Sequence, residues 1–239
     1  MASTSEVGFA KQLADYEDFL ELLSKLDDLY MPPKRELSLA NLRSHLTAAK
    51  EAMRAVSVAV PSYSTAVDKQ TLAFSVLNDK ITRSLNFYKV CISNPNEIDT
   101  AKNLANKIRG VSKKSKPVKD ADTPKKNVSQ SQVSFDSRIE NLKQYIDVLS
   151  ASGEYATSGS GIDIQDLNSI LTEMEETNGN VATAKLPIEE ARNKRYQIFY
   201  APNSGLADLV TKVKRYLRAT LAKDNPFYNA ITGFSFRKR

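Results

Sequence analysis

The sequence is poor in glycine and cysteine, has one histidine and lacks tryptophan. Its 239 residues include eight glycines, one cysteine (Cys91) and one histidine (His45). Scarce glycine argues against glycine-rich phosphate-binding loops and against β-rich folds with many tight turns. A single cysteine excludes an internal disulfide, a thiolate zinc cage and an iron–sulfur cluster, and a single histidine excludes a histidine-rich metal site.

Long apolar runs and export signals are lacking as well. Residues 1–8 contain neither a basic segment nor an apolar core of the kind that begins a secretory signal. No stretch approaches the roughly 18 apolar residues that a membrane-spanning helix needs. With 41% hydrophobic and 26% charged residues, the composition is that of an ordinary soluble protein. We therefore expect a cytoplasmic protein of one large or two small domains.

The net charge of +6 is unevenly distributed along the chain. Residues 1–30 hold seven acidic and two basic residues, whereas residues 101–134 hold nine basic and two acidic ones. Residues 205–239 hold eight basic and two acidic residues. The basic segments are either solvated or able to bind an anionic partner.

Helical periodicity dominates the first half. Apolar residues recur at spacings of three and four over residues 9–30, and Pro32-Pro33 ends this predicted helix. A sevenfold register then predicts long helices packed at small angles, through Leu46, Met53, Val60, Val67, Phe74, Ile81 and Tyr88. Pro61 lies inside this register, which predicts either a kinked helix or two nearly collinear ones. Asn94-Pro95 ends the stretch, and residues 97–109 predict a short helix before Gly110.

The second half repeats this pattern. At an offset of 126 residues, Phe135, Ile139 and Leu142 match Phe9, Leu13 and Tyr16, and Pro187 matches Pro61. Asn225-Pro226 echoes Asn94-Pro95. We therefore predict an all-α fold of two tandemly duplicated helical-bundle repeats with long, proline-kinked antiparallel helices. Residues 1–110 form repeat 1, 111–134 a basic polar linker, and 135–239 repeat 2 with a short basic tail. The two repeats either pack on each other about a pseudo-twofold axis or stay separate on the linker.

No residue pattern indicates catalysis, a metal or a cofactor. His45 has no second histidine or cysteine near it in sequence, and Cys91 falls on the apolar register, where a buried thiol is expected. The acids Glu173, Glu175, Glu176, Glu189 and Glu190 suit a solvated face, because no Glu-x-x-His accompanies them. GxxxxGK[ST], GxGxxG and GxSxG are absent. We therefore predict no catalytic residue, no cofactor and no enzymatic activity.

Basic residues in the linker, the last long helix and the tail are candidate contacts for an anion or a nucleic acid. They are Lys113, Lys114, Lys116, Lys119, Lys125, Lys126, Lys214, Arg215, Arg218, Arg237, Lys238 and Arg239. Basic clusters interleaved with aromatic residues bind phosphates and stack on bases. The alternative is a solvated linker and a helix whose charged face points away from the core.

Short motifs of the second half resemble a group of uncharacterised bacterial all-helical proteins. They are Phe135–Asn141, Ala191–Lys194, Gly205–Asp208 and Ile231–Phe236. The resemblance covers mainly residues 134–239, implies an all-helical fold and brings no function with it.

Three functions follow from these patterns. The leading prediction is a non-enzymatic helical scaffold or protein–protein interaction protein, able to assemble with itself. Acidic residues 1–30 of one molecule would then dock on a basic segment of another. The second is sequence-independent binding of nucleic acid through the linker and tail, and the third, a peripheral position on a membrane surface, is the weakest.

Overall fold

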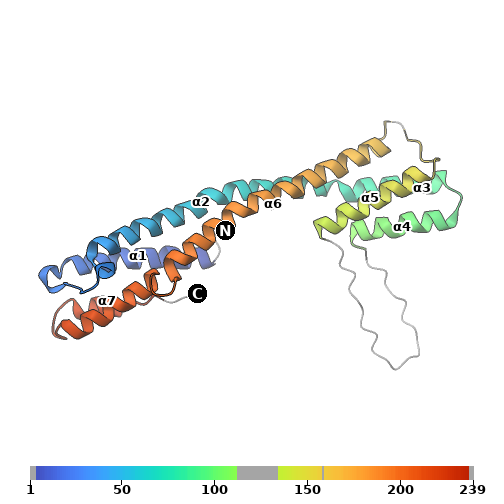
Figure 1. Ribbon diagram of the computed structural model, residues 1–239. Helices are drawn as coiled ribbons and strands as arrows, with labels where there is room; N and C mark the ends of the chain where they lie inside the picture. Colours follow the sequence, from blue (N-terminus) through green and yellow to red (C-terminus); the bar gives the residue numbers. More distant parts are fainter. Residues whose placement is uncertain (1–3, 112–133, 158, 237–239) are drawn as a thin grey trace, which may run out of the picture. The chain divides into compact units, whose positions relative to one another are not determined.

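The computed structural model describes residues 4–111, 134–157 and 159–236, and shows helices joined by turns (Figure 1). No strand occurs in these three ranges, which confirms the predicted all-α class. Two 3-10 helices, η1 (Asp27–Leu29) and η2 (Arg35–Leu37), precede the second α-helix. The α-helices are α1 (Thr4–Ser24), α2 (Leu39–Ser75), α3 (Leu77–Cys91), α4 (Pro95–Arg109), α5 (Phe135–Ala151), α6 (Ile164–Tyr200), α7 (Leu206–Thr220) and α8 (Tyr228–Gly233).

Local residues explain where several helices begin and end. The side chain of Asn94 accepts a hydrogen bond from the backbone of Asn96 at 3.0 Å, and Pro95 occupies the first turn of α4. Gly110 ends α4 in the left-handed conformation at φ 69°. Helix α1 begins before the predicted residue 9 and ends at Ser24, before the predicted end, and the chain then turns through Asp27, whose φ is 46°.

The two longest helices have the same length and run through their prolines. Helices α2 and α6 each contain 37 residues and stay helical at Pro61 and Pro187. Both prolines are exposed. Each proline lacks the N–H that would bond the carbonyl four residues earlier, and that carbonyl lies on a part of the helix that water reaches. Only Val76 separates α2 from α3.

The chain divides into two compact units, which we call unit 1 (residues 1–63 and 185–239) and unit 2 (residues 64–184). The chain passes from one unit to the other inside α2 and again inside α6. These units do not coincide with the segments 1–110 and 135–239 predicted from the sequence. Each unit instead combines part of the first segment with part of the second.

Each unit has its own apolar core. In unit 1 the core joins α1, α2, α6, α7 and α8 through Tyr16, Phe19, Leu23, Leu42, Phe199, Leu206, Val213, Leu217 and Ile231. In unit 2 it joins α2, α3, α4, α5 and α6 through Phe74, Ile81, Tyr88, Ile108, Leu142, Tyr145, Leu149, Leu167 and Met174. Burial of these large side chains stabilises each unit, because each removes apolar surface from water.

A tyrosine hydroxyl donates to a backbone carbonyl seven residues further along the chain in both units. In unit 1 Tyr30 donates to Leu37, and in unit 2 Tyr155 donates to Ile162 at 2.7 Å. The second pair lies 125 residues after the first. Both tyrosines are buried, and each closes the connection that leads into a 37-residue helix.

Candidate functional site

Most of the predicted basic contacts lie outside the described residues. These are Lys113, Lys114, Lys116, Lys119, Lys125, Lys126, Arg237, Lys238 and Arg239. The other three lie on α7 of unit 1. Lys214 donates through Nζ to the carbonyl of Phe234, and burial, helped by the charge of Arg218, lowers the pKa of its ammonium group. Arg215 and Arg218 are exposed.

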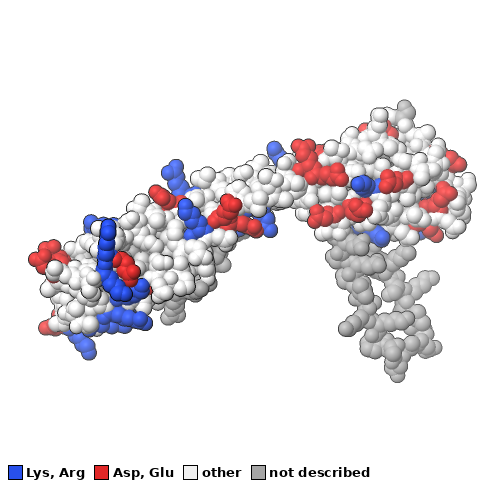
Figure 2. All heavy atoms as spheres, viewed as in Figure 1, with Lys and Arg blue, Asp and Glu red and all other residues white. Residues whose placement is uncertain are grey.

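The described residues of the two units differ in charge. Those of unit 1 include 16 Lys and Arg against 13 Asp and Glu, and those of unit 2 include 9 against 13. Figure 2 shows acidic side chains over unit 2 and basic side chains around α7. Acidic α1 and basic α7 share unit 1, where Glu17 pairs with Lys50 and Glu36 pairs with Lys212. These ion pairs neutralise two of the acidic residues of the N-terminal segment within a single molecule.

His45 and Cys91 are both partly buried. The Nε2 atom of His45 lies 3.0 Å from the carbonyl oxygen of Ile198, which links α2 to α6. Burial lowers the pKa of His45, and this hydrogen bond opposes the shift. Cys91 packs against the core of unit 2. Within the described ranges, no three His, Cys, Asp or Glu side chains are close enough together to hold a metal ion.

Gln70 and Ser84 are buried polar residues that interrupt a second sevenfold spacing of apolar residues, which runs through Leu42, Ala49, Val56, Tyr63 and Leu77. Gln70 donates to Asn178 at 2.7 Å, which connects α2 to α6 in unit 2. The hydroxyls of Ser84 and Tyr145 lie 2.9 Å apart and connect α3 to α5. These interruptions, already visible in the sequence, are therefore contacts between helices.

Arg195 is the buried charged residue that the sequence analysis missed. Only 3% of its surface is exposed. Its guanidinium lies 4.1 Å from the centre of the Phe9 ring, and its Nη1 lies 3.9 Å from the sulfur of Met53. Arg195 follows Ile188 by seven residues, so its position on the apolar face of α6 was a signal available in the sequence.

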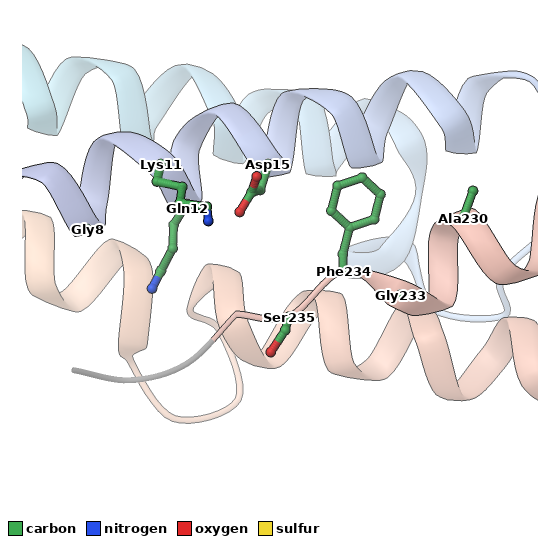
Figure 3. Close-up of a pocket in the computed structure, with 8 residues that line it drawn as sticks. All are labelled: Gly8, Lys11, Gln12, Asp15, Ala230, Gly233, Phe234 and Ser235. Carbon is green, nitrogen blue, oxygen red and sulfur yellow. The ribbon is translucent and has the colours of Figure 1, made fainter.

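A cleft of about 550 Å³ lies between α1 and the segment from α8 to Ser235 (Figure 3). Lys11, Gln12 and Asp15 line its α1 side, and Ala230, Gly233, Phe234 and Ser235 line the other. In Figure 3 the ring of Phe234 turns toward α1, whereas the hydroxyl of Ser235 points away from it. Gln12 accepts a hydrogen bond from Tyr200 at 3.0 Å, so its amide oxygen is already used within unit 1.

A second cavity, of about 610 Å³, lies between α2 and α6 in unit 1 and is called here the α2–α6 groove. Small and apolar residues form most of its surface, and two acids and two bases complete it: Glu51, Arg54, Ala55, Val58, Ala59, Pro187, Glu190, Ala191 and Lys194. Val58 is 68% exposed, and Leu186, beside Pro187, is 60% exposed. Val58 and Leu186 thus leave one apolar side chain of each helix uncovered.

No family model, curated protein or solved structure matches the chain. The resemblance of residues 134–239 to bacterial helical proteins therefore stays a prediction. No helix within the described residues is long and apolar enough to span a membrane.

Proposed function

We propose that the protein is a non-enzymatic helical interaction protein that binds a protein partner in the α2–α6 groove. The observation that carries this proposal is the exposure of Val58 and Leu186 beside a groove bordered by charges. A contiguous apolar surface with a polar rim is typical of a site where another protein docks.

The chemistry of the groove suits a helix better than a small molecule. Ala55, Ala59 and Ala191 are small, so a partner's backbone can approach closely and place larger apolar side chains between α2 and α6. Glu51, Arg54, Glu190 and Lys194 are exposed and would fix the orientation of such a partner. Covering the apolar residues supplies the driving force, at about 25 cal/mol per Å² of apolar surface removed from water.

A site-specific photo-crosslinker tests this proposal in the cells that make the protein. It replaces Val58 in the groove, and in a matched control it replaces Val90, which is 83% exposed on α3. We expect a protein adduct from position 58 and none from position 90. The adduct should be lost when Ala55 is also changed to arginine, because that side chain fills the groove with a charge.

Absence of any adduct from position 58 would refute the proposal. An adduct that disappears after nuclease treatment would refute it too, and would favour nucleic acid as the partner.

Nucleic-acid binding is the second candidate, and the exposure of Arg215 and Arg218 on one helix is what favours it. Exposed guanidinium groups bind phosphates, and such binding weakens steeply with salt. Anisotropy of a labelled random-sequence duplex, titrated with protein at several salt concentrations, tests it. Binding that is unchanged in the Arg215→Glu, Arg218→Glu variant would exclude these two residues from the contact.

We further propose that the fold arose by tandem duplication with a proline kink in each long helix. The equal lengths of α2 and α6, their prolines and the paired Tyr30 and Tyr155 contacts support this. The cytoplasm is the compartment we propose, because a single cysteine suits a reducing environment.

A further inference from the structure

We infer that the occupant of the α2–α6 groove is the same groove of a second copy of this chain. Two molecules would then pack α2 and α6 of one against α6 and α2 of the other as a bundle of four helices. This inference rests on the proposed function, because it names the protein partner of that groove. It follows from the direction of the two helices, the order of charges along them and the apolar residues next to the charges.

Helices α2 and α6 run antiparallel in unit 1. His45 contacts Ile198, and eight residues further along α2, Met53 contacts Arg195. Residue numbers therefore rise along α2 as they fall along α6. In this register Glu51 stands opposite Lys194 and Val58 stands opposite Pro187 in the groove.

Between these two positions, Arg54 of α2 stands opposite Glu190 of α6. Each wall of the groove thus holds one acid and one base, about one helical turn apart. The four charged side chains sum to zero, and the order of signs on one wall is the reverse of that on the other.

This order makes the groove complementary to itself. A twofold axis parallel to the helices places α2 of one molecule against α6 of the other at the same height, as a closed dimer requires. Glu51 then faces the partner's Lys194, and Arg54 faces the partner's Glu190. Val58 faces the partner's Pro187, beside the partner's Leu186. Every charged contact joins opposite signs, and the apolar residues meet next to the charged pairs, further along α2.

A mixing experiment tests this pairing with the purified full chain. Glu51→Lys alone brings two lysines together on both sides of the twofold axis, and Lys194→Glu alone brings two glutamates together there. Each variant should dimerise about tenfold or more weakly than the wild type, since like charges replace opposite ones at two places. An equimolar mixture of the two variants should restore dimers, because each new charge then meets an opposite one in the other molecule.

Sedimentation equilibrium over about 1–200 µM, a range that covers affinities common for reversible dimers, measures the association constant. Glu21→Lys and Arg192→Glu are the matched controls, because they make the same charge changes on exposed residues that do not line the groove. Both controls should leave association unchanged. Circular dichroism checks that every variant keeps the helical content of the wild type.

The apolar part of the contact has its own test. Val58→Lys should also weaken association about tenfold or more, since it places a charge among apolar residues, whereas Val90→Lys on α3 should not change it. If Val58→Lys weakens association but the mixture of Glu51→Lys and Lys194→Glu does not restore dimers, the proposed pairing of α2 with α6 is overturned.

The two proposals fail in distinguishable ways. A wild-type chain that is monomeric at every concentration, together with a Val58 adduct to a different protein, would overturn self-association and leave the proposed function standing. A monomeric chain without any Val58 adduct would overturn both. An adduct with the mass of two chains, together with restoration in the mixture, supports both.

Discussion

Replacing Gly205 with alanine should destabilise unit 1, because no space exists for a methyl group at the turn between α6 and α7. Gly205 is buried, and its N–H donates to the carbonyl of Ala201 at 2.8 Å. A Cβ atom at this position would lie 2.5 Å from the backbone nitrogen of Ala201 and 2.8 Å from its oxygen. These are backbone atoms, so no side-chain rotation relieves the clash. The φ of −71° is ordinary, so the effect is purely steric.

The cost follows from what must move. Inserting a methyl group into a packed site typically costs about 1–3 kcal/mol, and a clash with rigid backbone belongs at the upper end of that range. A loss of about 3 kcal/mol lowers the midpoint of thermal unfolding by about 6–12 °C in a chain of this size. The start of α7 moves as well, because the carbonyl of Gly205 accepts from Leu209 at 2.9 Å.

Thermal and urea unfolding, followed by far-ultraviolet circular dichroism, measure the effect. Gly233→Ala is the matched control, since it makes the same change in the same unit where nothing lies within 4 Å of the added Cβ. The control should change stability by no more than about 0.5 kcal/mol. A Gly205→Ala midpoint within about 2 °C of the wild type would show that the turn adapts without cost, and would refute the steric argument.

Two further predictions concern buried hydrogen bonds. Tyr155→Phe should lower the stability of unit 2 by about 1 kcal/mol, because the carbonyl of Ile162 loses its buried donor, and an unchanged urea midpoint would contradict this. Burial lowers the pKa of His45 below its ordinary 6.5, so the unfolded chain binds the proton more readily, and stability falls as the pH drops below that value. His45→Gln should therefore reduce the change of the urea midpoint with pH between about pH 7.5 and 5. An equal change with pH in the wild type and the variant would assign the effect to other groups.

The helices themselves were largely predictable from neighbouring residues. The pair Asn94-Pro95 and the single Gly110 mark the ends of α4 because capping and left-handed termination depend on the residues at the helix ends. The end of α1 was predicted too late. Leu26 and Tyr30 keep the helical spacing and are buried, yet they flank η1, beyond the end of α1. Apolar spacing reports which residues face the core, and it does not distinguish a helix from a tight turn that keeps the same residues inside.

The candidate site was not predictable in the same way. The basic contacts were predicted from the number of charges in the sequence, yet Lys214, one of them, bonds to the backbone of Phe234. The sevenfold register predicted that Val60 would lie on an apolar seam, yet Val60 is 40% exposed. Whether a side chain on a periodic stripe is covered depends on what packs against it, and the stripe alone carries no information about that.

The sequence by itself determined the all-α class and the long helices, because periodicity and helix ends are local properties of the chain. Only the tertiary structure decided which helices share a core. Unit 1 joins His45 to Ile198, 153 residues apart, and unit 2 joins Gln70 to Asn178, 108 residues apart. Such pairs form because their burial together outweighs the entropy of closing a long loop, which grows slowly with its length. The α2–α6 groove exists only as a result of that pairing, because the residues of its two walls are more than 100 positions apart in the chain.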